Sequence, residues 1–178
     1  PMEDNVGLFG YTFNLTGTTL QNIVIKDSII IGHDNVGCLL GYNRSNVKII
    51  NCCSTGSVSG NDYVGGLVGN NYGTGAAVAS SYSGCNVVGN KYIGGLVGRS
   101  YGAIITSCYS IGSVTGSSNL GGLVGFKYLG TITLSYYDSE TSGCSGTAAG
   151  IPKTTAEMKQ QETFVDWDFT DVWAIDPS

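Results

Sequence analysis

The hexapeptide Val64-Gly65-Gly66-Leu67-Val68-Gly69 decides the fold, because it recurs along most of the chain. It returns as IGGLVG at 93–98 and as LGGLVG at 120–125, and degenerate copies precede it as VGLFG at 6–10 and VGCLLG at 36–41. The closing glycines of successive copies are separated by 31, 28, 29 and 27 residues. Five copies at near-constant spacing identify a repeat protein.

A second recurring segment, rich in small residues, follows the motif. NCCSTGSVSG at 51–60 aligns with SSYSGCNVVG at 80–89 and with SCYSIGSVTG at 107–116. Each repeat therefore holds two or three short runs of Val, Ile, Thr and Tyr bounded by Gly, Asn and Ser, and no helical periodicity is found before residue 150. This predicts an all-β fold, a right-handed parallel β-helix (β-solenoid) of about five coils over 1–151. A β-sandwich or barrel made of the same strands is the alternative.

Alignment of the repeats predicts which side chains stack. The expected columns are Ile50, Ala79, Thr106 and Leu134; Val58, Val87 and Val114; Cys52, Ser81, Cys108 and Tyr136; and Asn51, Ser80, Ser107 and Ser135. Five tyrosines also recur, at Tyr63, Tyr72, Tyr92, Tyr101 and Tyr128. One interpretation buries them at corners of the coils. The other makes them an exposed stripe that contacts a ligand, since tyrosine combines a flat apolar face with a hydroxyl group.

Composition restricts the function. The 178 residues include 28 glycines, yet 42 % are hydrophobic, which argues against a disordered linker. A net charge of −5 argues against a nucleic-acid partner, and no apolar run is long enough to insert into a membrane. No signal peptide is visible at the start of the sequence.

Groups suited to catalysis are sparse. The single histidine, His33, lies in a turn whose equivalents are asparagine or serine, so we expect a solvated turn residue. Asp138 and Glu140 form the closest acidic pair and would share one face of a strand. Calcium at this pair is the alternative to having no cofactor, although calcium takes six to eight oxygen ligands. We expect no enzymatic activity and no catalytic or metal-binding residues.

The chain contains six cysteines without CxxC spacing or nearby histidines, which argues against zinc. They are Cys38, Cys52, Cys53, Cys85, Cys108 and Cys144. Six cysteines allow 15 pairings. Cys52 and Cys108 would lie two coils apart, roughly 9.6 Å, beyond disulfide reach. We expect mostly free or partly paired thiols.

Residues 152–178 differ from the repeats, since they hold eight of the 21 charged residues and both tryptophans. Thr154 and Glu157 match a capping box and predict a short helix over 155–161. The aromatic residues after it are Phe164, Trp167, Phe169 and Trp173. We expect this segment to cap the open end of the solenoid, where strand edges would otherwise be exposed. An aromatic platform for a ligand is the alternative.

The GLVG core at 66–69, with the G-x-I-x-x-S-x-Y pattern at 102–109, resembles the GLUG repeat family. The segment from Lys153 to Ile175 resembles the closing segment that often follows such repeats. That family occurs in large secreted or surface-attached bacterial and archaeal proteins, including filamentous-haemagglutinin-like adhesins and the non-catalytic regions of some immunoglobulin-A-cleaving proteases. The resemblance implies an extracellular module and no catalytic residues. The first copy, VGLFG, departs from the family pattern because it lacks a glycine.

Three functions follow as hypotheses. The first is a non-enzymatic module of a cell-surface adhesin-like protein, acting in attachment or as a stalk, with a glycan or a host or matrix protein as partner. The second is a self-assembling envelope or filament subunit, whose partners are copies of itself. The third is a carbohydrate-active β-helix enzyme, which would need clustered carboxylates that the repeats lack.

Overall fold

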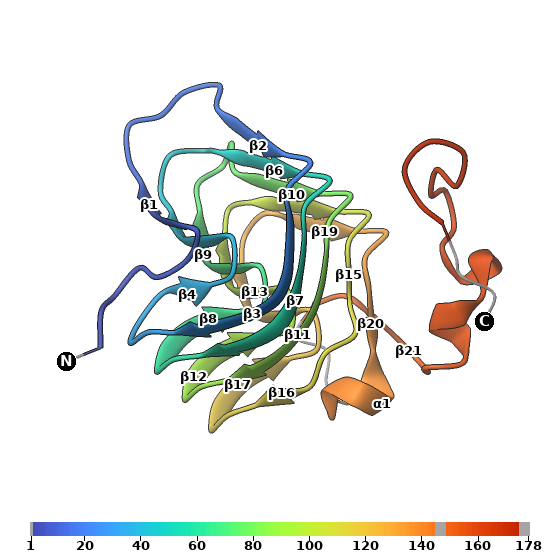
Figure 1. Ribbon diagram of the computed structural model, residues 1–178. Helices are drawn as coiled ribbons and strands as arrows, with labels where there is room; N and C mark the ends of the chain where they lie inside the picture. Colours follow the sequence, from blue (N-terminus) through green and yellow to red (C-terminus); the bar gives the residue numbers. More distant parts are fainter. Residues whose placement is uncertain (1, 145–148, 175–178) are drawn as a thin grey trace.

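The computed structural model describes residues 2–144 and 149–174, so Ile175 of the expected closing segment lies outside the described residues. The chain winds into a parallel β-solenoid of about five coils, as predicted (Figure 1). A complete coil has four strands rather than the two or three expected, because the hexapeptide motif itself forms the end of one strand and the start of the next. The four strands of each coil lie in four separate parallel sheets, named A to D here.

Equivalent strands of successive coils pair in register. Sheet A contains β4 (Val36–Gly37), β8 (Asp62–Gly65), β12 (Lys91–Gly94) and β17 (Ser118–Gly121). Sheet B contains β1 (Phe9–Thr12), β5 (Leu40–Asn43), β9 (Val68–Tyr72), β13 (Val97–Tyr101) and β18 (Val124–Tyr128). Sheet C contains β2 (Thr19–Gln21), β6 (Lys48–Ile50), β10 (Ala77–Ala79), β14 (Ile104–Thr106) and β19 (Thr131–Thr133). Sheet D contains β3 (Val24–Ile31), β7 (Cys53–Ser59), β11 (Tyr82–Val88), β15 (Tyr109–Ser110), β16 (Val114–Thr115), β20 (Tyr136–Asp138) and β21 (Ile151–Lys153).

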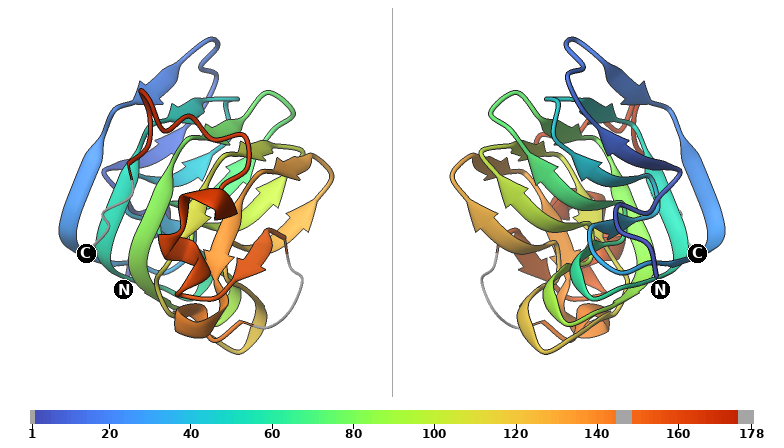
Figure 2. Two further views of the ribbon diagram at one scale, coloured as in Figure 1. Left: turned by 90° about the vertical axis from the view of Figure 1, so that its right-hand side faces the viewer. Right: turned by 90° about the vertical axis from the view of Figure 1, so that its left-hand side faces the viewer.

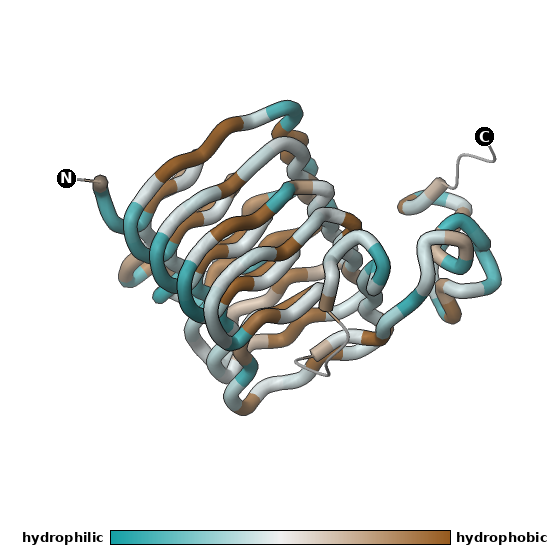
Figure 3. The backbone as a smooth tube through the Cα atoms, turned by 90° about the horizontal axis from the view of Figure 1, so that it is seen from below, coloured by the Kyte–Doolittle hydropathy of each residue, from teal (hydrophilic) through white to brown (hydrophobic). Residues whose placement is uncertain are grey.

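The core is a set of apolar columns inside the stack, visible as hydrophobic segments that recur from coil to coil (Figure 3). The predicted column of Val58, Val87 and Val114 is confirmed by the register of β7, β11 and β16. The motif glycines lie where backbones approach closely. A Cβ atom on Gly69 would come within 2.6 Å of the Gly41 carbonyl oxygen in the neighbouring coil. Only glycine therefore fits this column without displacing backbone.

The last coil is shifted by one residue from the predicted alignment. Thr106 pairs with Thr133 rather than Leu134, and Tyr109 rather than Cys108 pairs with Tyr136. The steps in this part of the chain are 27 residues, whereas the prediction used 28. Leu134 instead takes the left-handed position (φ 47°) that Ser107 takes in the coil before, so the columns assigned to Leu134, Ser135 and Tyr136 were wrong in this coil.

The C-terminal end of the core is covered by the end of the last coil and by residues that follow it. Tyr137 is 1 % exposed, and Cys144 and Ala149 pack against the same core cluster. Strand β20 ends in a single turn of helix, α1 (Ser139–Ser142), and β21 then pairs with β20 as one further rung of sheet D. This rung crosses the boundary expected between 151 and 152.

The aromatic segment of the tail lies beside the solenoid rather than over its end, against the outer face of sheet D (Figures 1 and 2). The short helix predicted over 155–161 is present only as a 3₁₀ turn, η1 (Glu157–Lys159), because Gln160 is extended and separates it from a second 3₁₀ turn, η2 (Gln161–Thr163). The capping box itself is present: Thr154 N donates to Glu157 Oε2 at 2.8 Å, and Glu157 N donates to Thr154 Oγ1 at 3.2 Å.

Candidate functional site

Two predicted tyrosine columns stack on the outside of the solenoid. Tyr72, Tyr101 and Tyr128 close β9, β13 and β18, and their ring centroids are 4.6 and 5.0 Å apart. Tyr72 is 36 % and Tyr128 is 50 % exposed, so the interpretation that buries this column at a corner does not apply to it. The register places the rings one coil apart, which is the stacking distance of aromatic faces.

The second column consists of Tyr63 and Tyr92, whose half-buried rings stack at 5.1 Å and are nearly parallel. Arg99 connects the two columns, since its guanidinium carbon lies 5.4 Å from the Tyr63 ring centroid and 5.6 Å from that of Tyr101. Cation–π attraction therefore joins both columns into one surface. We call the five tyrosines and Arg99 the tyrosine surface.

Tyr63 and Tyr92 occupy a strained backbone conformation. Both have positive φ, 57° and 61°, at a position where Asn35 and Asn119 have the same conformation in other coils. Asparagine tolerates this left-handed region, whereas a bulky aromatic residue there is unusual. A strained backbone conformation of this kind persists only where contacts with the surrounding structure hold it in place. Such conformations are found most often at functional sites.

A third column, Tyr82, Tyr109 and Tyr136, was missed because the predicted alignment placed Tyr136 beside Cys108. The rings of Tyr82 and Tyr109 stack at 4.8 Å on the outer face of sheet D. Trp167 and Trp173 of the tail pack over this column, with centroids 6.1 and 5.5 Å from Tyr109. Burial under the tail raises the pKa of Tyr109 above its ordinary value and that of Tyr82 to about 12, so both phenols stay neutral at neutral pH.

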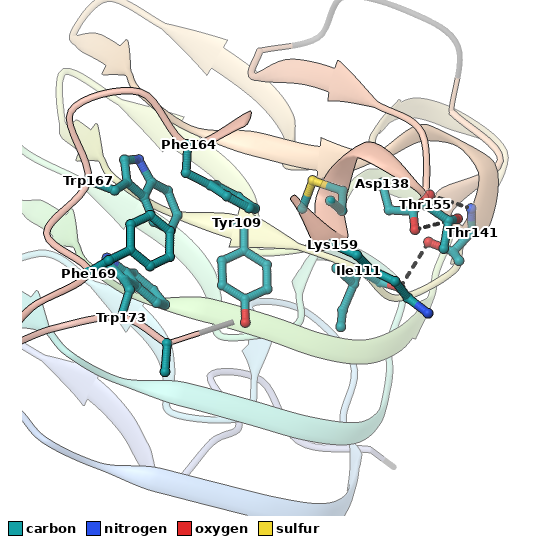
Figure 4. A pocket seen from close by; sticks show the side chains of 12 residues that line it. Tyr109, Ile111, Asp138, Thr141, Thr155, Lys159, Phe164, Trp167, Phe169 and Trp173 are labelled. Carbon is teal, nitrogen blue, oxygen red and sulfur yellow. Dashed lines mark hydrogen bonds between the residues drawn. The ribbon is translucent and has the colours of Figure 1, made fainter. Parts of the chain in front are cut away.

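A cavity of about 420 Å³ lies between the tail and sheet D (Figure 4). Tyr109, Phe164 and Trp173 line one end of it, whereas Asp138 and Thr155 line the other. Lys159 also borders the cavity. Aromatic walls with a few polar groups are typical of small-ligand sites. This cavity corresponds to the aromatic platform considered as the alternative role of the tail.

The acidic pair near the cavity is arranged differently from the prediction. Asp138 ends β20 and caps α1, where its Oδ1 accepts hydrogen bonds from the amides of Glu140 and Thr141. Its Oδ2 accepts from Thr155 Oγ1 at 2.7 Å, and Glu140 Oε2 accepts from the Thr155 amide at 2.9 Å. The expectation that both residues share one face of a strand is therefore wrong. The two carboxylates instead fasten the start of the tail.

His33 lies in the expected exposed turn and belongs to a ladder of hydrogen bonds. Its Nδ1 is 3.0 Å from Asp4 Oδ1, and one coil further Asn61 Nδ2 donates to Asp34 Oδ1 at 3.0 Å. Hydrogen bonds from the Asp34 amide and from His33 lower the pKa of Asp4. Asp4, His33 and Asp34 place their ligand atoms within 4.8 Å of one another, and the ladder accounts for this arrangement.

All six cysteines are buried and free. Cys52 and Cys108 share a column with Ser81 between them: the Cys52 amide donates to Ser81 Oγ, and the Cys108 thiol donates to a carbonyl of β10. Burial raises the pKa of Cys108 to about 12, so it stays a neutral thiol at neutral pH.

No helix among the residues that the structure describes has the length and apolar character to cross a bilayer. The model of the GLUG motif matches residues 89–115, which run from the turn before β12 to the end of β16.

Two curated proteins are similar to parts of the chain. Halomucin of Haloquadratum walsbyi is 43 % identical over 51 residues, which is 29 % of this chain and 0 % of halomucin to the nearest per cent. A Gly-rich membrane protein of Evansella cellulosilytica is 46 % identical over 41 residues, 22 % of this chain and 5 % of that protein. The matches thus span a small fraction of these relatives, and no solved structure matches the chain. A GLUG motif on a β-solenoid, with partial similarity to these two proteins, is consistent with the repeat region of a surface protein.

Proposed function

We propose that this chain is a non-enzymatic, extracellular module of a cell-surface adhesin-like protein, acting in attachment or as a stalk. The observation that carries the proposal is the in-register stack of nearly identical coils, which displays the tyrosine surface on its outside. Its GLUG motif and its similarity to halomucin and to a Gly-rich membrane protein support a place at the cell surface.

The stack suits a stalk for a mechanical reason. The four complete coils pair with one another in four sheets at once, so bending the stack would strain hydrogen bonds along several of its sides. Each added coil lengthens a solenoid by about 4.8 Å without changing its cross-section. Such a scaffold can hold a binding surface at a distance set by the number of coils.

The tyrosine surface is the part of this scaffold suited to attachment. The stacked rings cover one another's faces, so each column presents a row of ring edges and hydroxyl groups, and Arg99 adds hydrogen-bond donors. A row of hydroxyl groups and an arginine matches a glycan, whose own hydroxyl groups can donate to and accept from them. A polar patch on a host or matrix protein is the other ligand that the tyrosine surface could bind.

A binding array of glycans and matrix proteins tests attachment. We expect the wild-type chain to bind, and the triple variant Tyr72→Ala, Tyr101→Ala, Tyr128→Ala to lose at least tenfold in affinity. The matched control is Val24→Ala, Ile29→Ala, Ile31→Ala, which removes exposed apolar side chains from sheet D and should bind like wild type. Equal loss in both variants, or no binding by the wild type, would contradict an attachment role and leave a passive stalk.

Catalysis is tested on the same material. Polysaccharides incubated with the chain should release no new reducing ends over a day. Release above that of a boiled sample would overturn the non-enzymatic proposal in favour of a carbohydrate-active enzyme.

Self-assembly is a second candidate function, favoured by the N-terminal end of the stack. Strands β1, β2 and β3 each lie at the edge of their sheet in the described part of the chain, and Phe9, Phe13 and Ile31 are exposed on this coil. Unprotected strand edges are templates for pairing with another chain. Sedimentation over a range of concentrations, with and without reductant, should then show ordered oligomers. A strictly monomeric species under all conditions would exclude assembly through this edge.

A further inference from the structure

The thiols of Cys38 and Cys85 meet inside the solenoid, although 47 residues separate them in the sequence. Their sulfur atoms are 3.5 Å apart, and the two residues are 1 % and 0 % exposed. Cys38 follows β4 in one coil, and Cys85 lies in β11 of the next. The contact therefore connects two coils across the interior.

This contact arises where two cysteines replace glycines of the repeat, since Cys85 stands where Gly56 and Gly112 stand in the aligned coils. Cys38 replaces the second motif glycine, and its equivalent Gly66 has no room for a side chain because an added Cβ would collide with Ser83 Oγ. In sheet D, Gly56 pairs with Ser28 on one side and with Cys85 on the other.

Gly56 carries no side chain, and the Cys38 thiol lies between those two partners. Its sulfur is 3.1 Å from Ser28 Oγ and 3.5 Å from Cys85 Sγ. The absence of a side chain at Gly56 thus leaves space for the Cys38 thiol, which contacts Cys85.

The environment makes the two thiols unequal. The hydrogen bond from Cys38 lowers the pKa of the Cys85 thiol, and the hydroxyl groups of Ser54 and Ser83 act in the same direction. The same contact and burial raise the pKa of Cys38. We take Cys85 as the attacking sulfur and Cys38 as the resolving one, because their 3.5 Å contact allows the Cys38 thiol to donate to a Cys85 thiolate.

We propose that Cys38 and Cys85 form a redox pair that hydrogen peroxide closes into an internal disulfide between coils. The Cys85 thiolate attacks one peroxide oxygen, the O–O bond breaks, and the hydroxide that leaves takes up a proton to give water and a sulfenic acid. The Cys38 sulfur then attacks Cys85 Sγ, the S–O bond breaks, and a second water leaves. Two thiols are oxidised by two electrons, and one peroxide is reduced to two waters.

The geometry needs only a small adjustment for this step. The sulfur atoms must approach from 3.5 Å to the disulfide distance of about 2.05 Å. The closed bond would connect residues 47 positions apart and restrict the unfolded chain. We expect Tm to rise by on the order of 10 °C. A thiol reductant would reverse the change by two exchange steps.

The test uses the full chain, fully reduced and freed of reductant. After hydrogen peroxide treatment, the protein is denatured, its remaining thiols are alkylated, and peptides are mapped by mass spectrometry. We expect two of the six thiols to be lost, one linked pair of peptides carrying Cys38 and Cys85, and a Tm that falls back after reduction. Cys38→Ser and Cys85→Ser should each abolish the link.

The matched control is Cys52→Ser, Cys108→Ser, which removes two buried cysteines outside the pair and should form the link like wild type. Peptide mapping of the wild type does not depend on the folding of any variant. Six alkylated thiols after peroxide, a link through a different pair, or Cys85 oxidised to sulfinic acid without a link would each overturn the proposal.

Discussion

The first and the last described coils are built from the same repeat, yet their outer sides are covered differently. At the N-terminal end, inward-facing residues of the first coil such as Val6, Leu20 and Ile30 stay partly exposed. At the C-terminal end, Tyr137 and Cys144 are buried over the last coil, and α1 and β21 follow. Among the described residues, the covering of the core beyond the last coil therefore depends on sequence outside the repeat.

The consequence is a gradient of stability along the stack. In a solenoid, stability is approximately the sum of each coil's own stability and its contacts with adjacent coils. A coil in the middle has two such contacts, whereas the first coil has one in the described chain. We therefore expect the N-terminal coil to open first.

The largest effect is expected at the covered end. Tyr137→Ala should lower the free energy of unfolding by about 3–5 kcal/mol, because it removes a buried ring from the core and leaves a cavity. Tyr11→Ala, at the other end, should cost about 1 kcal/mol, since Tyr11 is exposed, stacks on Phe13, packs at an angle against Tyr42 and accepts a long hydrogen bond from Arg44 Nη1. Urea unfolding followed by circular dichroism measures both. Equal losses would show that the two ends do not differ.

Two residues that are partners in neighbouring strands allow the first coil to be compared directly with an inner coil. Leu20 and Ile49 are direct partners in β2 and β6, so they fill equivalent positions one coil apart. Ile49→Ala should cost about 2–5 kcal/mol, whereas Leu20→Ala should cost roughly half as much because less of its side chain is removed from water. Hydrogen exchange should also be faster in β2 than in β6. A larger cost at Leu20 would contradict the gradient.

The smallest effect concerns acid and the start of the tail. Hydrogen bonds from the Thr154 amide and hydroxyl, and then from Lys153, lower the pKa of Glu157 below its ordinary value of 4.5. A lowered pKa means that this capping contact stabilises fully above pH 4.5 and is lost as pH falls through the folded value. The Thr154 amide resonance should report that loss in NMR titrations.

Glu157→Gln is the matched variant, because it keeps the shape of the side chain and removes its charge. We expect its Thr154 resonance to be independent of pH across the range around the ordinary glutamate pKa of 4.5. A transition of the same size in this variant would assign the titration to another group.

Local repetition explains why so much of the fold was predictable. Val58, Val87 and Val114 could be aligned because each coil contains a copy of its neighbour, and stacking places copies one above another. The same logic predicted the columns of Tyr72, Tyr101 and Tyr128 and of Tyr63 and Tyr92. Whether these tyrosines contact a ligand stays a prediction.

Errors began where the repetition ended. A step of 27 residues instead of 28 moved Leu134, Ser135 and Tyr136 to other columns, and this concealed the outward-facing column that the tail covers. Asp138 has no equivalent in the other coils that could show it to be a helix cap, and its sequence spacing to Glu140 suggested a strand.

By itself, the sequence determined a β-solenoid of about five coils, the register of its inner coils and the capping box at Thr154. Only the tertiary structure decided that the aromatic tail lies along sheet D, that Tyr137 closes the core, and that Cys38 meets Cys85. The physical reason is that stacking of like coils depends on side chains repeated at fixed spacing, which one sequence displays. Contacts between unlike segments depend on distances across the fold, and no periodic pattern records them.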